Sequence, residues 1–123
     1  IDALATFLHK PGAGLAIARA GGEPVGFAAW YRPDEPSTTK LDKLYVLPPQ
    51  HGRGTGRALI AHVEAAARRE GARTLILNVN KRNAKAIAAY RACGFATREA
   101  VVADIGGGFV MDDYVMAKAI GPG

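Results

Sequence analysis

A glycine-spaced turn between an apolar strand pattern and a helical pattern constrains this chain more than any other feature. The turn reads His51-Gly52-Arg53-Gly54-Thr55-Gly56 and follows Pro48-Pro49. A helix that starts after such a turn leaves its first amide N–H groups unpaired and carries partial positive charge there. Glycines let a ligand come close to the backbone. The glycine turn therefore predicts an anion site, and a phosphate is the anion that suits it.

The patterns on either side of the glycine turn predict one α/β domain over residues 1–123, with a central mixed β-sheet flanked by helices. Strand–helix–strand order in the middle of the chain predicts parallel pairing there, and hairpins at both ends predict antiparallel pairing. Residues 2–9 are compatible with one or two helical turns. We expect strands at 14–20, 25–31, 40–47, 74–79, 95–104 and 109–118, and helices at 57–70 and 83–93.

The strand that enters the glycine turn carries side chains that alternate between two faces. Successive side chains of a strand point to opposite sides of the sheet. We therefore expect Leu41, Lys43 and Tyr45 on one face of the strand at 40–47. The other face would hold Asp42, Leu44 and Val46.

Charge is distributed unevenly along the chain. The net charge is +5, and ten Lys and Arg residues lie between Arg53 and Arg98, whereas acidic residues concentrate in the flanks. This distribution suits a phosphate-rich ligand that meets a cationic one. Aromatic residues make up only 7% of the chain, so the stacking platform of a nucleic-acid-binding domain is missing and we expect no nucleic-acid partner.

The single cysteine, Cys93, excludes an internal disulfide and gives no zinc-binding spacing, so we expect no metal. No apolar run approaches the roughly 18 residues that span a bilayer, and no secretory signal is visible. We therefore expect no membrane partner and a cytoplasmic location.

Two common phosphate-binding motifs do not fit the glycine turn. A P-loop needs Lys and then Ser or Thr after its last glycine, but Arg57-Ala58 follows Gly56. A dinucleotide fingerprint starting at Gly54 needs a third glycine at position 59, which is Leu59.

The turn instead resembles the acetyl-CoA pyrophosphate loop of the GNAT superfamily of N-acetyltransferases, written [Q/R]-x-x-G-x-[G/A]. Residues 51–56 fit this pattern at every position but the first, where His51 stands after Gln50. The strand Leu44-Tyr45-Val46-Leu47-Pro48 matches the strand that enters the family's loop. The family's second signature is matched by Asn83-Ala84-Lys85-Ala86, Tyr90 and Gly94-Phe95. The resemblance covers roughly residues 14–118.

The resemblance implies a GNAT fold, acetyl-CoA as co-substrate and an amine as acceptor. It implies that Asn83 hydrogen-bonds the cofactor arm and that the Tyr90 hydroxyl lies near the CoA sulfur. The family normally has a strand and a helix ahead of the first hairpin, so we expect these N-terminal elements to be missing. The implied cofactor-binding residues are Leu44, Tyr45, Val46, His51, Gly52, Arg53, Gly54, Thr55, Gly56, Arg57, Asn83 and Tyr90.

Several assignments keep two interpretations. Without the glycine turn, Asn83 would be read as an N-cap and Tyr90 as a core tyrosine. Asp42 can be interpreted equally well as a general base near the turn or as an ordinary charged residue at a strand edge. Cys93, at a helix C-terminus whose dipole opposes a thiolate, is favoured as a small buried side chain over a nucleophile. The acids around the last hairpin form either an acidic rim or turn residues; they are Asp104, Asp112 and Asp113.

The function expected from the sequence is direct acetyl transfer from acetyl-CoA to a primary amine that is small and cationic. Tyr90 would serve the leaving thiolate and Asp42 would serve as the base. A protein N-terminal or lysine acetyltransferase and a non-catalytic acyl-CoA-binding module both stay open as alternatives, as does a homodimer.

Overall fold

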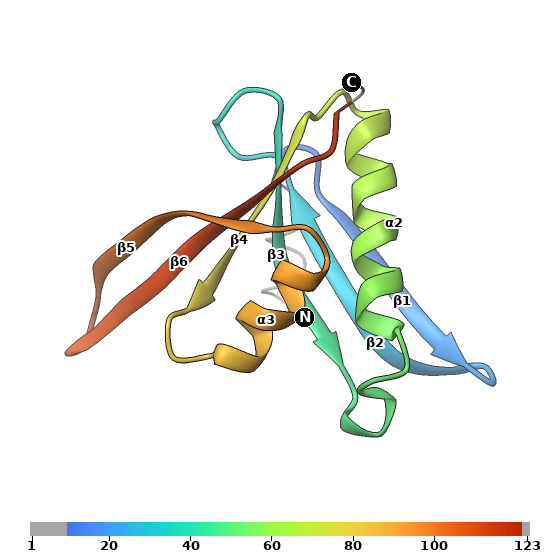
Figure 1. Cartoon of the computed structure of the whole chain (residues 1–123). Helices are drawn as coiled ribbons and strands as arrows, with labels where there is room; N and C mark the ends of the chain where they lie inside the picture. The colour runs from blue at the N-terminus through green and yellow to red at the C-terminus, as the bar shows by residue number, and fades with distance from the viewer. Residues whose placement is uncertain (1–9, 122–123) are drawn as a thin grey trace.

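The computed structural model describes residues 10–121, and within them one mixed sheet carries both α-helices on the same face (Figure 1). The predicted helical turns at 2–9 lie outside the described residues. The elements are β1 (Gly14–Ala20), β2 (Glu23–Tyr31), β3 (Thr38–Val46), the 3-10 turn η1 (Pro48–Gln50), α2 (Thr55–Arg69), β4 (Thr74–Asn80), α3 (Ala84–Ala92), β5 (Ala96–Gly106) and β6 (Phe109–Ala119). Every strand and helix predicted beyond residue 10 is therefore present, with boundaries that differ by one or two residues.

The strands follow the order β1-β2-β3-β4-β6-β5 across the sheet. The β1–β2 and β5–β6 hairpins and the parallel β3–β4 pair confirm three of the predicted pairings. The parallel pairing expected from the second crossover is wrong, because β6 lies between β4 and β5 and pairs antiparallel with both. Burial explains why β6, and not β5, lies next to β4. Val115 and Met116 of β6 are buried, whereas β5 has no buried residue. The more apolar strand takes the inner position.

The core fills the space between the sheet and the two helices. Leu75 and Leu77 of β4, Met116 of β6 and Val63 of α2 are almost completely buried there. Each such side chain contributes about 1.5–3 kcal/mol through the hydrophobic effect. Ile87 of α3 joins the same cluster, so both helices are packed on one face of the sheet. Neither described α-helix is long and apolar enough to cross a membrane.

A β-bulge at Asp42 changes the alternation of β3. Ala29 pairs with Lys43 while the next residue of β2, Trp30, pairs with Leu41, so Asp42 is an extra residue in β3. Leu41 is therefore buried in the core, and Leu44 and Val46 pack against the same core. The prediction that Leu41 shares a face with Lys43 and Tyr45 is wrong, because strict alternation does not allow for the bulge.

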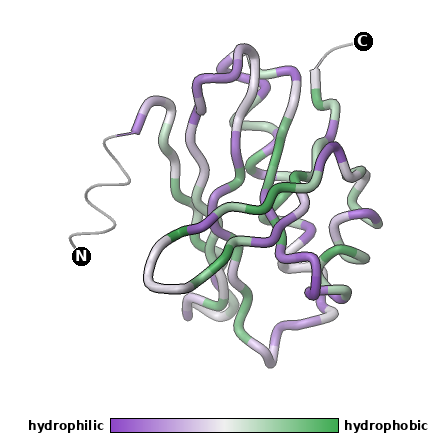
Figure 2. The backbone as a smooth tube through the Cα atoms, turned by 90° about the vertical axis from the view of Figure 1, so that its left-hand side faces the viewer, coloured by the Kyte–Doolittle hydropathy of each residue, from purple (hydrophilic) through white to green (hydrophobic). Residues whose placement is uncertain are grey.

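The β5–β6 hairpin extends beyond the rest of the sheet, and its end points toward the viewer in Figure 2. β4 pairs with β6 only as far as Asp113, so the remaining hairpin is two strands wide. Apolar side chains near its glycine tip are largely exposed: Val102, Ile105, Phe109 and Val110. Two strands without further support are marginally stable in water, so this end is the least supported part of the sheet.

Two ion pairs join distant parts of the chain. Glu64 of α2 is buried and pairs with Lys118 of β6 at 2.5 Å, with Arg68 at 4.0 Å. On the surface, both guanidinium N–H groups of Arg98 donate to Glu35, at 2.9 and 3.1 Å. This hydrogen bonding by Arg98 lowers the pKa of Glu35. The first pair fastens α2 to the sheet, and the second fastens the β2–β3 loop to β5.

We expect Lys118→Met to lower the free energy of unfolding by roughly 2 to 4 kcal/mol, because it leaves the Glu64 carboxylate buried beside only a distant Arg68. The double variant Glu64→Met/Lys118→Met should regain most of this loss, since no buried charge then remains. Arg98→Met breaks the exposed pair and should cost less than about 1 kcal/mol. Urea denaturation measures all three, and equal losses in the single and double variants would refute the buried-charge explanation.

Candidate active site

The parallel strands β3 and β4 separate partway along their length. Their ladder runs from Thr38↔Thr74 to Leu41↔Leu77 and stops there. β3 nevertheless continues to Val46 and β4 to Asn80. Residues 42–46 and 78–80 therefore border a gap in the sheet, which we call the strand gap, and Figure 1 shows the two strands diverging there.

The backbone of β3 presents hydrogen-bonding groups to the strand gap. The Leu47 N–H donates to the Val25 carbonyl at 2.8 Å. In an antiparallel ladder such bonded pairs alternate with non-bonded ones. Leu44 and Val46, which alternate with Leu47, therefore direct their N–H and C=O groups away from β2 and toward the gap. An extended ligand inserted there would find strand-like hydrogen-bond partners.

The start of α2 lies next to the end of β3 and has no side-chain cap. Its N-cap residue is Gly54 in the left-handed conformation (φ 82°), and Gly52 also has a positive φ of 77°. No acidic side chain lies in its first turn. The first intrahelical bond is Ala58 N–H to the Gly54 carbonyl, at 2.9 Å. The amide N–H groups of Gly54, Thr55, Gly56 and Arg57 have no backbone partner and are therefore available to an anion.

The start of α3 is different, because it is capped by its own side chain. Asn83 Oδ1 accepts a hydrogen bond from the Ala86 N–H at 3.2 Å. The N-cap interpretation of Asn83 is thus confirmed, and one of its oxygen lone pairs is used within the protein. Its side-chain amide nitrogen has no partner among the described residues and can donate to a ligand.

Tyr90 sits on α3 one turn beyond Ile87 and packs against the core. Its ring meets Phe95 edge-on, with centroids 5.8 Å apart. Burial raises the pKa of the Tyr90 hydroxyl, and the neighbouring Cys93 raises it further. The hydroxyl is therefore a proton donor, not a phenolate, at neutral pH. This influence of Cys93 has a sequence signal, because a spacing of three residues on a helix puts the two side chains on adjacent positions.

The acidic candidates are partly engaged in local contacts. Asp42 Oδ2 pairs with Lys43 Nζ at 2.6 Å at the bulge that begins the strand gap. Asp112 pairs with Lys81 at 2.5 Å, and Asp104 Oδ1 accepts from the Gly106 N–H at 2.8 Å. Asp104 is thus a turn residue, while the base role of Asp42 stays a prediction. Within residues 10–121, no three His, Cys, Asp or Glu side chains gather as metal ligands do.

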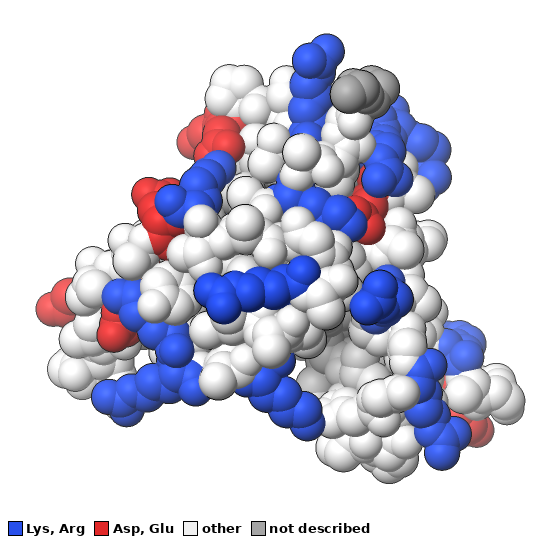
Figure 3. All heavy atoms as spheres, viewed as in Figure 1, with Lys and Arg blue, Asp and Glu red and all other residues white. Residues whose placement is uncertain are grey.

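Basic side chains remain around the hollow between the two helices. Arg68, Lys81 and Arg98 are held in ion pairs within the protein. Figure 3 shows the helix-covered face hollowed between α2 and α3, with Lys and Arg side chains around the hollow. Six cations on the glycine turn, α2 and the α3 segment have no ion-pair partner among the described residues: Arg53, Arg57, Arg69, Arg82, Lys85 and Arg91.

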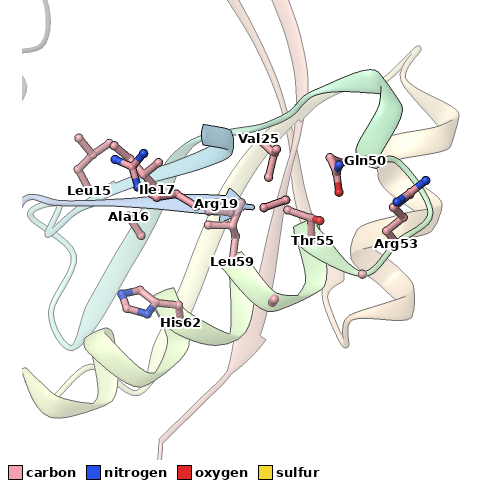
Figure 4. A pocket seen from close by; sticks show the side chains of 14 residues that line it. Leu15, Ala16, Ile17, Arg19, Val25, Gln50, Arg53, Thr55, Leu59 and His62 are labelled. Atoms are coloured by element: carbon pink, nitrogen blue, oxygen red, sulfur yellow. The ribbon is translucent and has the colours of Figure 1, made fainter. Parts of the chain in front are cut away.

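A separate hollow of about 600 Å³ lies on the other side of α2, between this helix and the edge strand β1 (Figure 4). Gln50, Arg53 and Thr55 form one end of it, and His62 lines its wall. No residue of β4 or α3 reaches it, so Asn83 and Tyr90 do not line it. This hollow is therefore distinct from the strand gap, and the chemistry of Tyr90 has no access to it.

The combination of a strand gap, an uncapped glycine start of a helix and a protonated tyrosine on the next helix agrees with one family profile. The profile described as acetyltransferase (GNAT) family matches residues 1–95. The chain belongs to the GNAT acetyltransferase family. The resemblance seen in the sequence and the predicted α/β fold are thereby confirmed.

Individual GNAT proteins support this membership. An uncharacterised N-acetyltransferase of Mycobacterium tuberculosis is 34% identical over 116 residues, which cover 94% of this chain and 73% of the relative. An aminoglycoside N(6')-acetyltransferase type 1 of Stenotrophomonas maltophilia is 41% identical over 98 residues, covering 74% of this chain and 64% of that enzyme. Among solved structures, a nourseothricin acetyltransferase superimposes with a TM-score of 0.81 at 28% identity, covering 89% of this chain and 66% of that one.

We expect the Tyr90 hydroxyl to titrate above the value of about 10 that is normal for tyrosine, because burial disfavours the phenolate. The measurement is an ultraviolet titration of the wild type and of Tyr90→Phe, whose difference isolates one hydroxyl. A difference component with a midpoint at or below 10 would show that the ring is more hydrated than its packing implies.

Proposed function

We propose that this GNAT chain transfers an acetyl group from acetyl-CoA directly to a primary amine that is small and cationic. The observation that carries the proposal is the uncapped glycine start of α2 beside the open backbone of β3. One end of an elongated, phosphate-bearing cofactor fits the first feature, and its amide-containing arm fits the second. The six unpaired cations of the glycine turn, α2 and the α3 segment favour a ligand with several phosphate charges.

In the proposed complex, the pyrophosphate accepts hydrogen bonds from the N–H groups of the glycine turn and the first turn of α2. The N–H groups concerned are those of Gly52, Gly54, Thr55, Gly56 and Arg57. His51 and Arg53 are the other predicted residues of this loop, and their N–H groups donate to the Pro48 and Gln50 carbonyls. The amide-containing arm of the cofactor follows the β3 edge at Leu44, Tyr45 and Val46. It accepts a hydrogen bond from the side-chain N–H of Asn83. All of these residues were predicted from the sequence, and their contacts with a cofactor stay predictions.

The proposed reaction is a single direct transfer. The neutral amine forms a bond to the thioester carbonyl carbon, and a backbone N–H of the β3 edge stabilises the charge that develops on oxygen. The carbon–sulfur bond then breaks, and the CoA thiolate takes a proton from the Tyr90 hydroxyl. The amine loses its extra proton to a base, for which Asp42 is our candidate. The products are the acetylated amine and free CoA.

The preference for a cationic acceptor rests on acidic residues beside the strand gap. An alkylamine with a pKa near ~10.4 is mostly protonated at neutral pH and must be bound before it loses its proton. Asp113 of β6 lies close to the end of β4, since it pairs with Asn80, whereas the neighbouring Asp112 is already held by Lys81. Carboxylates there would raise the local concentration of a cation. The similar aminoglycoside N(6')-acetyltransferase carries a polycationic acceptor class in its name, which agrees with this choice.

We expect Gly54→Val to abolish CoA binding. A β-branched residue is strained at a φ of 82°, and its side chain would stand where the phosphate approaches the helix start. Isothermal titration with CoA measures the effect, and circular dichroism reports whether the domain is folded.

Gly22→Val is a matched control for this experiment. Gly22 lies in the β1–β2 turn with a φ of 85°, and a Cβ there also meets no atom within 4 Å, so the backbone strain is alike. We expect the Gly22 variant to bind CoA as the wild type does. Wild-type affinity in the Gly54 variant would remove the pyrophosphate assignment.

The reaction itself is tested with acetyl-CoA and a panel of polyamines, aminoglycosides, amino acids and peptide N-termini, with CoA release as the readout. We expect release with small polycationic amines, and a fall in kcat of roughly 10- to 100-fold in Tyr90→Phe with little change in CoA affinity. Turnover of peptide N-termini or lysine peptides alone would favour the protein acetyltransferase instead. Binding of acetyl-CoA without release above buffer for any amine would favour the non-catalytic module.

A further inference from the structure

The one position at which the glycine turn departs from the family pattern makes a specific contact. His51 Nε2 lies 2.8 Å from the carbonyl oxygen of Val46, five residues earlier on β3. A carbonyl only accepts hydrogen bonds, so the imidazole must donate from Nε2, which fixes its tautomer. The side chain of the first residue of the turn thus reaches back to the end of the strand.

Among the described residues, no other side-chain hydrogen bond joins the glycine turn to β3. The backbone bonds of the segment are local turns: Gln50 N–H to Leu47, His51 N–H to Pro48 and Arg53 N–H to Gln50. A Cβ added at Gly52 or Gly54 would meet no atom within 4 Å, whereas one at Gly56 would lie 3.8 Å from Val46 Cγ2, so the turn is close to β3 at its helical end only. At the other end, the imidazole is the side chain that holds the turn to the strand.

The carbonyl that His51 uses belongs to the strand gap. Leu47 donates to Val25 on β2, and Val46 alternates with it, so the Val46 carbonyl faces away from β2. A carbonyl oxygen has two lone pairs, and one stays available to a ligand in the gap. His51 consequently links the part of the protein that would hold a phosphate with the part that would hold an extended arm.

We propose that His51 is a positioning residue that sets the spacing between the glycine turn and the β3 edge, and that it acts through Val46 and not by touching the phosphates. The inference rests on the proposed binding of CoA. It predicts that His51 matters for a ligand that spans both parts and matters little for a ligand that occupies one part. Direct contact with the phosphates would give the opposite pattern for a phosphate-only ligand.

The test compares three ligands by isothermal titration: CoA, adenosine 3',5'-bisphosphate for the glycine turn alone and pantetheine for the strand gap alone. We expect His51→Ala to weaken CoA binding by roughly 3- to 10-fold, the usual worth of one exposed hydrogen bond. The two partial ligands should change by less than about 2-fold. His51→Gln should restore CoA binding, because its Nε2–H stands at a similar distance from the backbone and donates to a carbonyl.

A second histidine provides a control for the substitution itself. His62→Ala on α2, far along the helix from the glycine turn, should leave CoA affinity unchanged. In steady-state kinetics, His51→Ala should raise the KM for acetyl-CoA while kcat stays near the wild-type value.

Three results would overturn the inference. These are unchanged CoA affinity in His51→Ala, equally weak binding in His51→Gln, or a loss for adenosine 3',5'-bisphosphate as large as that for CoA. Failure of the wild type to bind CoA would refute the proposed function and this inference together, whereas the three results above leave the proposed function standing.

Discussion

The short parallel ladder between β3 and β4 is the constraint on which the rest of the site depends. Four residue pairs hold the two strands together, and the bulge at Asp42 begins where the last pair ends. A bulge bends its strand and increases the local twist, so β3 turns away from β4 at this point. Leu44 and Val46 then keep their bonding groups free on one side while β2 holds the strand on the other. If β3 and β4 were paired along their whole length, the backbone N–H and C=O groups of Leu44 and Val46 would be used within the sheet and could not bind a ligand.

The two helix starts differ in whether their backbone N–H groups are free for a ligand: those of α2 are uncapped, and that of α3 is capped by Asn83. Both follow a strand and both lie on the same face of the sheet. Asn83 satisfies its own helix, whereas the start of α2 has glycine in the left-handed region and no capping side chain. Glycine at the N-cap gives up a side-chain cap at a cost of about a few tenths of a kcal/mol relative to Asn or Ser. Such a cost is understandable where a ligand provides the missing acceptors.

Much of the fold could be predicted because its signals are local. The positions of the strands and helices and the Asn83 cap depend on neighbours in the sequence, and each appears at or within two residues of the expected place. The bulge at Asp42 could not be predicted, because it depends on how Leu41 and Trp30 pack across two strands. The position of β6 between β4 and β5 was missed for a similar reason, since it is decided by a comparison of burial between two strands of one hairpin. The GNAT family was recognisable from motif spacing, but the contact of His51 with Val46 has no sequence signature.

The net positive charge of the chain indicates a kind of ligand only when the cations held in ion pairs are separated from those without a partner. Arg98 and Lys118 are occupied in holding loops and helices to the sheet, by pairing with Glu35 and Glu64. An ion pair of that kind neutralises the cation locally and leaves it with little attraction for a ligand. Arg53 and Arg57 have no such partner and stand at the helix start, where the dipole is also positive. Net charge alone would suit nucleic acid as well as a cofactor. Arg53 and Arg57 stand together at one helix terminus beside a gap in the sheet, and that arrangement suits a compact, multiply charged ligand better than a long polyanion.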